Sequence, residues 1–370
     1  MSIEPIVMPK WGLAMQEGTL SKWNVAEGDR VAKGQEIADI ETTKIANAFE
    51  SPVEGVVRRR VIAEGDIVPV GALLAVVADP GVGDAEIDDF VEEFQRTMAV
   101  AADDSVAAPE PQLVDTAAGR IRYLKLGEGG GTPVVLIHGF GSDHAAWMFN
   151  HEALATGRPV YALDLPGHGG STKVVGGGSV EDLAAAVVAF LDAAEVGRAH
   201  LVGHSLGGAI AATIAARHPG RAASLSLIAP AGIAEEINQA FIDGFVSETR
   251  ARKLRGVIEL IVADPAMVTA DMVEDVLKFK RLDGAAEALA QVAAANFAAG
   301  RQVTSIREVL AGAGVPVQVI VGVEDRVLPP AGADDLPAAV AVHRVAGAGH
   351  LPHMEKSAEV NRLIEAVVAG

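Results

Sequence analysis

A serine in the C-terminal half has the surroundings of a nucleophile. Residues 203–207 read G-H-S-L-G, with Ser205 at the centre. An apolar run precedes this pattern and an alanine-rich run follows it. The pattern predicts a sharp turn between a strand and a helix that presents the serine hydroxyl to a substrate. Gly203 and Gly207 are small residues of the kind that keep such a turn free of clashes. The chemistry predicted for Ser205 is acyl transfer.

Two further groups complete this arrangement. Asp325 comes shortly after the apolar run VQVIVGV, and His350 lies in the glycine-rich segment AGAGHLPHME. Serine, aspartate and histidine in this order have the chain order of α/β-hydrolases. We expect His350 to accept the proton of Ser205, and Asp325 to fix the imidazole tautomer and stabilise its charged form. Glu324 and His353 are the nearest alternatives, but each is displaced from the position that the pattern expects.

A glycine-rich segment after another apolar run predicts the oxyanion loop. It spans His138 to Gly141. The backbone N–H groups of Phe140 and Leu206 are the expected donors to the oxyanion, and losing one such donor typically costs about 3–4 kcal/mol. His138 is interpreted as shaping this loop rather than as transferring protons. Asp164, in LDLPGHG, follows another apolar run and is interpreted as a structural residue that holds its loop.

A lysine near the N-terminus is a candidate of a different kind. Lys44 lies between two copies of an internal repeat, because residues 18–40 align with residues 55–77 without a gap and both contain A-E-G-D. Two copies indicate a folded pair rather than a solenoid. Their short apolar runs, broken by glycines, predict two β half-units that close into a small sandwich. Lys44 would then lie at a hairpin tip, where the alternative is a solvated surface lysine.

The elements that must position these groups divide the chain into three parts. Residues 1–79 contain the repeat. Residues 80–112 are acidic, rich in alanine and bounded by proline, and they predict a flexible linker with a short helix near residues 84–94. That helix is either a solvated linker helix or a docking helix for the neighbouring domain or a partner. In residues 113–370, buried-strand runs alternate with alanine-rich stretches, which is typical of a parallel sheet. From about 232 to 301 only helices are predicted, which suggests a lid over the site.

Composition narrows the classes of function. The formal net charge of −19 disfavours binding to nucleic acid or to anionic membranes. The chain lacks cysteine, which excludes disulfides and fits a reducing cytoplasm. Its N-terminus shows no signal-peptide pattern, and no apolar run is long enough to span a bilayer. We therefore expect a cytoplasmic protein, and we expect no metal site.

Residues 1–79 resemble lipoyl domains along their whole length, through MPKWGLAMQEGTLSKWNVAEGDRVAKGQEIADIETTKI and the glycine-rich second half. In that family the hairpin lysine carries lipoate in amide linkage, and Lys44 is the matching position. Biotin carriers share the fold, but methionines usually flank their lysine, so Thr43 and Ile45 favour lipoate. The family commonly has aspartate where Thr43 stands, which is a small departure.

Residues 113–370 resemble α/β-hydrolases through the motifs above, so the expected fold is an all-β lipoyl-type sandwich followed by an α/β-hydrolase fold with a helical lid. The combination resembles the acetyltransferase components of bacterial acetoin dehydrogenase complexes. The resemblance implies that an acetyl group passes from a thiamin-dependent acetoin-cleaving partner to lipoate and then to coenzyme A. It also implies dihydrolipoamide dehydrogenase as a partner, and a homo-oligomer or complex core.

One departure separates this chain from the acyltransferases of the usual 2-oxo acid dehydrogenase complexes. Those enzymes use an H-x-x-x-D-G motif, whereas here the two D-G pairs, at 243–244 and 283–284, have Gln239 and Phe279 in the histidine position. No peripheral-subunit-binding domain is recognisable. Two alternatives therefore remain: an esterase or C–C bond hydrolase with an attached carrier domain, and a non-catalytic scaffold. Free acid as product would indicate hydrolysis, and acetyl-CoA would indicate transfer.

Overall fold

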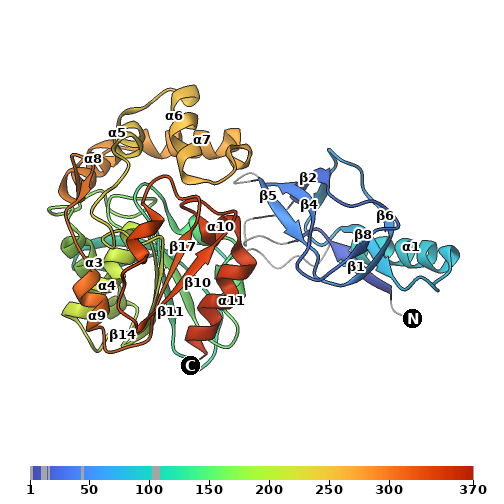
Figure 1. Ribbon diagram of the computed structural model, residues 1–370, viewed down its shortest axis with the longest axis horizontal. Helices are drawn as coiled ribbons and strands as arrows, with labels where there is room; N and C mark the ends of the chain where they lie inside the picture. Colours follow the sequence, from blue (N-terminus) through green and yellow to red (C-terminus); the bar gives the residue numbers. More distant parts are fainter. Residues whose placement is uncertain (1–2, 10–14, 16, 43–45, 102–108, 370) are drawn as a thin grey trace. The chain divides into compact units, whose positions relative to one another are not determined.

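The computed structural model describes residues 3–9, 15, 17–42, 46–101 and 109–369. The chain divides into two compact units, residues 1–108 and 109–370. Figure 1 shows strands dominating the N-terminal unit, and a sheet flanked by helices in the C-terminal unit. Each unit is described separately below.

The N-terminal unit contains two four-stranded sheets, with strand orders β1-β8-β6-β3 and β5-β4-β2-β7. The strands are β1 (Ile3–Val7), β2 (Glu17–Trp23), β3 (Arg30–Val31), β4 (Glu36–Glu41), β5 (Ala46–Glu50), β6 (Gly55–Arg60), β7 (Ile67–Pro69) and β8 (Leu73–Ala78). The first repeat copy supplies β2, β3 and β4, and the second supplies β6, β7 and β8. Each copy places its short middle strand in the other copy's sheet, because β3 pairs with β6 and β7 pairs with β2. The predicted two-part β sandwich is confirmed.

The A-E-G-D segments make the same turn in both copies. The carboxylate of Asp29 accepts the N–H of Ala26 at 2.8 Å, and that of Asp66 accepts the N–H of Ala63 at 2.8 Å. The glycine in each turn has a left-handed φ, +95° in the first copy and +92° in the second, which residues with a side chain rarely adopt. The local sequence therefore dictates these turns, and the repeat is a repeat of structure.

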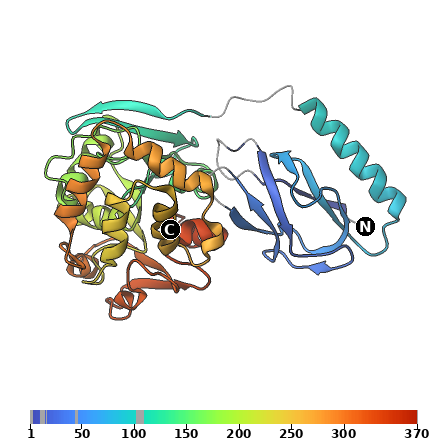
Figure 2. The same ribbon diagram turned by 90° about the horizontal axis from the view of Figure 1, so that it is seen from above.

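Helix α1 (Asp84–Ala101) has 18 residues, so it is longer than the short helix expected in the linker. It packs on the N-terminal unit, where Ile87 is buried against a cluster that includes Leu73 and Val76 of β8. Asp84 pairs with Arg58 at 2.9 Å, and Asp88 pairs with Arg59 at 2.5 Å. Figure 2 shows α1 running along the strands of this unit. The two possibilities left open by the sequence are thus decided, because the helix docks on its own unit.

We expect Ile87→Ala to destabilise the N-terminal unit by about 2–5 kcal/mol, because it removes a fully buried branched side chain and leaves a cavity. Urea unfolding of the full chain would measure the change through its tryptophan fluorescence, to which Trp23 of this unit contributes and in which Trp147 reports the C-terminal unit. Asp89→Ala is the matched control on the exposed face of α1, with an expected effect within about 0.5 kcal/mol. Equal stability of the two variants would contradict the packing of α1.

The C-terminal unit is built on an eight-stranded sheet with order β18-β17-β14-β13-β11-β12-β10-β9. Its strands are β9 (Gln112–Thr116), β10 (Gly119–Leu126), β11 (Val134–Ile137), β12 (Val160–Leu163), β13 (Ala199–His204), β14 (Ala222–Ile228), β17 (Val317–Gly322) and β18 (Val340–Val345). The strands from β11 onward pair in parallel, as predicted, while β9 and β10 pair antiparallel.

Helices cover both faces of this sheet, so alternate residues of a strand are buried on opposite sides. In β11, Val135 and Ile137 pack with α3 and α4, whereas Val134 and Leu136 pack with α11. The helices around the sheet are η2 (His144–Trp147), α2 (His151–Leu154), α3 (Val180–Ala193), α4 (Leu206–Arg217), α9 (Arg307–Ala311), η5 (Pro330–Ala333), α10 (Pro352–Glu355) and α11 (Ser357–Val368). The predicted α/β-hydrolase architecture is confirmed.

Helices also fill the chain between β14 and β17. They are α5 (Gln239–Ser247), α6 (Ala251–Ile258), η3 (Glu259–Ile261), η4 (Pro265–Met267), α7 (Ala270–Lys280) and α8 (Ala285–Asn296), followed by the small hairpin β15 (Phe297–Ala298) and β16 (Arg301–Gln302). Figure 1 shows α5 to α8 gathered at one end of the eight-stranded sheet. This is the segment that the sequence assigned to a lid.

Candidate functional site

Ser205 occupies a strained turn between β13 and α4. Its φ is 50° and its ψ is −117°, a region that costs a residue with a side chain about 1–3 kcal/mol. Backbone bonds hold it there: its N–H donates to the carbonyl of Ile228 at 2.9 Å, and its carbonyl accepts the N–H of Ala231 at 2.9 Å. The strand β14 and the segment after it therefore fix the serine at the carboxyl end of the sheet.

The glycines beside Ser205 are required by close backbone approach. A Cβ on Gly203 would lie 2.3 Å from the carbonyl oxygen of Gly207. A Cβ on Gly207 would lie 2.1 Å from the carbonyl oxygen of Ile137, the last residue of β11. Both distances are far below contact, so any larger residue would open the turn. The sequence pattern indicated this need, and the structure supplies the atoms responsible for it.

His350 and Asp325 meet after the ends of two neighbouring parallel strands, β18 and β17. The Nδ1 of His350 lies 2.8 Å from the Oδ2 of Asp325, and both side chains are buried. The other carboxylate oxygen accepts the N–H groups of Val327 and Leu328 at 2.8 and 2.9 Å. A carboxylate oxygen accepts, so Nδ1 is the donor in this pair and Nε2 is the ring nitrogen left to act as a base.

His204, the residue before the nucleophile, links Ser205 to His350. Its Nε2 lies 2.8 Å from the backbone carbonyl of His350, and the two rings are 4.9 Å apart. Burial lowers the pKa of His204 well below its usual value, so the ring is neutral and Nε2 is the donor. His350 is therefore held next to the end of β13, directly before the nucleophile.

The two alternatives considered from the sequence lie elsewhere. The carboxylate of Glu324 accepts the N–H of Ala348 at 3.1 Å. His353 is buried against Trp147 and His204, with ring centroids 4.7 and 4.6 Å away. Burial lowers the pKa of His353 to about 3. Within the described part of the chain, neither of its ring nitrogens has a hydrogen-bond partner. A neutral, enclosed imidazole of this kind is poorly placed for proton transfer to substrate.

The loop expected to hold an oxyanion passes directly beside the nucleophile. A Cβ on Gly139 would lie 3.0 Å from the Cβ of Ser205. The Nε2 of His138 accepts the N–H of Leu165 at 2.9 Å, so its Nδ1 carries the proton and donates to the carbonyl of Gly139 at 2.7 Å. The peptide group between Gly139 and Phe140 is trans and planar. The hydrogen bond that fixes the Gly139 carbonyl therefore also sets the direction of the Phe140 N–H. Leu206, the second predicted donor, is the first residue of α4.

Aromatic contacts join the segment between β14 and β17 to this loop. The ring of Phe140 lies 5.8 Å from that of Phe245 on α5 and 5.9 Å from that of Phe297. A Cβ on Gly141 would lie 2.1 Å from the ring of Phe245. The sequence did not single out Phe245 and Phe297, because nothing local indicates which face of α5 meets the loop.

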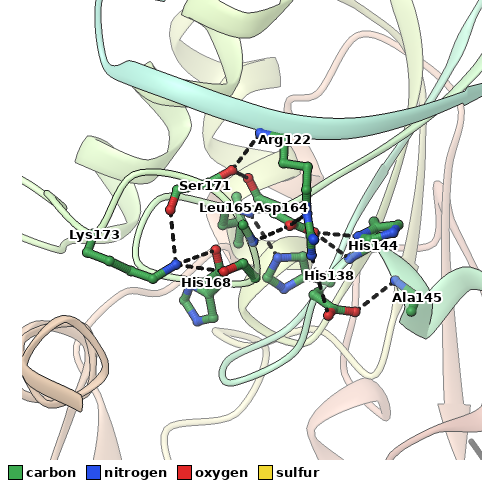
Figure 3. Close-up of polar contacts among 12 residues, drawn as sticks. Arg122, His138, His144, Ala145, Asp164, Leu165, His168, Ser171 and Lys173 are labelled. Atoms are coloured by element: carbon green, nitrogen blue, oxygen red, sulfur yellow. Dashed lines mark hydrogen bonds and ion pairs between the residues drawn. The ribbon is translucent and has the colours of Figure 1, made fainter. Parts of the chain in front are cut away.

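Asp164 is buried and lies at the centre of a polar network (Figure 3). One oxygen accepts the Nε–H of Arg122 at 2.5 Å and the N–H of Gly170 at 2.7 Å, and the other accepts the N–H of His144 at 2.8 Å. Burial alone would raise the pKa of Asp164, but His144 and Arg122 together lower it well below its usual range. This arrangement agrees with the structural role predicted for Asp164.

Three side chains of this network could also hold a cation. One ligand atom each of Asp143, His144 and Asp164 lies within 4.8 Å of the others. However, the guanidinium of Arg122 already supplies a positive charge to Asp164. The expectation that the chain has no metal site stays a prediction.

We expect Asp164→Asn to destabilise the C-terminal unit by about 3–5 kcal/mol at neutral pH, because it leaves Arg122 without its buried partner. The folded-state pKa of Asp164 is depressed, so its contribution is present above about pH 4 and is lost as the pH falls. Chemical unfolding from pH 7 to pH 3 should therefore show a smaller loss for the variant than for the unmodified chain. Parallel pH curves would contradict this account.

Lys44 lies outside the described residues. The strands on either side of it pair as far as Glu41 and Ala46. Residues 42–45 therefore connect β4 and β5, and the predicted lipoyl lysine belongs to that connection. None of the helices in the described part of the chain is both long and apolar enough to cross a membrane.

Comparisons with known proteins agree with both folds. Residues 132–357 match the family described as alpha/beta hydrolase fold, and residues 4–77 match the family described as biotin-requiring enzyme. A solved meta-cleavage product hydrolase superposes with a TM-score of 0.63 at 23% identity, covering 70% of this chain and 97% of its own. That likeness concerns the fold.

Two relatives are similar over nearly the whole chain. The dihydrolipoyllysine-residue acetyltransferase component of the acetoin cleaving system of Cupriavidus necator is 42% identical over 369 residues, covering 100% of this chain and 98% of the relative. The protein of the same description from Pseudomonas putida is 44% identical over 361 residues, covering 97% of each chain.

Proposed function

The chain belongs to the family of dihydrolipoyllysine-residue acetyltransferase components of acetoin cleaving systems, and on this premise we propose that Ser205, His350 and Asp325 carry out the acetyl transfer. The observation that carries the proposal is the 2.8 Å contact between His350 and Asp325. It lies at the carboxyl end of the sheet, where Ser205 occupies its strained turn. The chain is an acyltransferase, and its active site is built on an α/β-hydrolase scaffold.

Lys44 is proposed as the residue that carries lipoate. The N-terminal unit fits this role, because β4 and β5 pair to the edge of the four-residue connection that contains Lys44. The Nζ of Lys44 would hold the group in amide linkage. When bound, lipoate supplies a dithiol able to carry an acyl group as a thioester, which a chain without cysteine cannot supply itself.

The first half of the proposed reaction acylates the serine. The Oγ of Ser205 attacks the carbonyl carbon of an acetyl thioester while Nε2 of His350 takes its proton. Asp325 stabilises the charged imidazole, and the N–H groups of Phe140 and Leu206 donate to the oxyanion. The C–S bond then breaks, and His350 returns the proton to the leaving sulfur. The products are acetyl-Ser205 and a free thiol.

The second half transfers the acetyl group to coenzyme A, the proposed acceptor. His350 takes the thiol proton, and the sulfur attacks the acetyl-serine carbonyl. The C–O bond breaks and Ser205 regains its proton. Water in place of coenzyme A would give acetate. We assign the exclusion of water to the lid, whose Phe245 and Phe297 contact Phe140 of the oxyanion loop.

The partners follow from the chemistry at each end of this cycle. A thiamin-dependent acetoin-cleaving subunit would supply the acetyl group, and dihydrolipoamide dehydrogenase would reoxidise the dithiol. The names of the relatives place them in a multi-component system. We propose that this chain acts as a homo-oligomer or as the core of such a complex. Tethering of carrier and catalytic units in one chain gives effective concentrations near the millimolar range.

Product analysis tests the reaction. Lipoylated protein is reduced, acetylated on the arm and mixed with coenzyme A, and the products are then identified by mass spectrometry. We expect acetyl-CoA as the main product. Free acetate as the main product would instead favour the hydrolase alternative. If the acetyl group moves to coenzyme A only at the rate of an uncatalysed thiol exchange, the C-terminal unit would be a non-catalytic scaffold.

A further inference from the structure

The middle of the lid contacts the loops that carry His350 and Asp325. Residues 259–263, here called the anchor segment, connect the lid helices α5 and α6 to η4, α7 and α8. The N–H of His350 donates to the carbonyl of Ile261 at 2.8 Å. The approach is close, since a Cβ on Gly349 would lie 2.7 Å from the carbonyl carbon of Val262. The lid is thus fastened at its middle to the loop of the proposed base.

A buried glutamate reinforces this attachment. Glu355, in α10, accepts the N–H groups of Gly349 and Leu351 on one oxygen, at 2.8 and 3.2 Å. Its other oxygen accepts the N–H of Ala263 at 2.7 Å. One carboxylate therefore holds the backbone on both sides of His350 and joins it to the anchor segment. A carboxylate suits this position because both of its oxygens are acceptors.

An arginine makes the equivalent attachment on the other side of the triad. Arg326 directly follows Asp325 in the sequence. Its guanidinium donates to the carbonyl of Val262 at 2.7 Å, and also to the carbonyl of Glu259. The side chain is planar and carries several donors, so it can bind two carbonyls at once. The anchor segment thus bridges the aspartate loop and the histidine loop.

We propose that Glu355 and Arg326 are positioning residues that use the anchor segment to hold His350 and Asp325 in register with Ser205. Proton transfer between Ser205 and His350 then depends on the seating of the lid. A misplacement of about 1 Å at a reacting group can cost about 100-fold in rate. The inference rests on the proposed function, because it requires Ser205 to be the nucleophile.

The test measures the reactivity of Ser205 in the full-length protein with a fluorophosphonate probe, with the labelled residue identified by mass spectrometry. Glu355→Gln keeps the size of the side chain but replaces one acceptor oxygen with a donor NH₂ group. We expect the maximal labelling rate to fall about 10- to 100-fold, with little change in the probe concentration at half-maximal rate. The pH midpoint of labelling should also shift, because the base is held differently.

Arg326 gives an independent test because its side chain is exposed. Arg326→Gln should slow labelling about 10-fold, and Arg326→Lys should recover part of the rate, since an ammonium group can still donate to both carbonyls. Two controls carry the same changes away from the triad. Glu365→Gln affects a contact with Arg158, and Arg344→Gln affects a contact with Asp334. Both controls should be labelled at the unmodified rate.

The outcomes separate the two proposals. If the unmodified protein is not labelled at Ser205, the proposed function fails. If the unmodified protein is labelled and the folded Glu355→Gln protein reacts at the same rate with the same pH midpoint, the positioning role is overturned. If Glu355→Gln does not fold, the Arg326 series decides, and labelling of Arg326→Gln at the unmodified rate overturns the inference.

Discussion

Ser205→Ala is expected to reduce acetyl-CoA formation by about 10³-fold or more while the protein stays folded and lipoylated. The change removes only the Oγ that would form the acyl bond. The turn itself is held by the backbone bonds of residue 205 to Ile228 and Ala231, which alanine retains. The close approach of Gly203 and Gly207 is also unaffected. Circular dichroism and thermal unfolding should match the unmodified chain.

The other members of the triad sharpen this test. A nucleophile and base that act as one unit lose activity together, so His350→Ala and the double variant with Ser205→Ala should lose about as much as Ser205→Ala alone. Asp325→Asn should lose somewhat less, because the imidazole stays in place with a poorer tautomer. The rates of acetyl-CoA formation by these variants in single-turnover experiments would show the pattern.

One result would exclude the covalent route. If Ser205→Ala forms acetyl-CoA at the unmodified rate, acetyl-Ser205 is not an intermediate. The acetyl group would then move directly from the arm to coenzyme A, and the C-terminal unit would act as a scaffold. Loss of soluble protein would instead show that Ser205 is structural.

Lys44→Arg is expected to abolish lipoylation, and with it acetyl-CoA formation in the reconstituted system. Arginine keeps the positive charge but cannot form the amide linkage. The intact mass of protein expressed in cells with a lipoate-attachment system should lack the lipoyl increment. Lys22→Arg, the same change at an exposed position of β2, is the matched control and should retain the increment.

The same variant separates the two units of the chain. Ser205 of Lys44→Arg should still react with a fluorophosphonate probe at the unmodified rate, because the hydrolase-type unit has its own sheet and core. A biotin increment on the unmodified chain would contradict the assignment of Lys44 to lipoate. A lipoyl increment that persists in Lys44→Arg would place the attachment elsewhere.

The sequence alone determined the features that depend on interactions between residues close together in the chain. The A-E-G-D turns recur because an aspartate side chain caps a turn that needs a glycine, so the repeat could be recognised from the sequence. The turn at Ser205 was predictable for the same reason, since Gly203 and Gly207 are demanded by atoms within a few residues or on the adjacent strand. The alternation of strands and helices then predicted a parallel sheet, with the site at the carboxyl ends of its strands.

Tertiary structure decided the features that depend on distant partners. The apolar stripe of α1 fitted either a solvated or a docked helix, and only the neighbouring β8 shows which surface covers Ile87. Glu355 gave no local signal, because the backbone N–H of Ala263 that it accepts lies 92 positions away in the sequence. Asp325 and Glu324 are adjacent; the pattern favoured Asp325, and the fold supplies the contact of its carboxylate with His350. The spacing of apolar residues shows which face of a helix or strand is buried. The residues that cover that face are decided only by the tertiary structure.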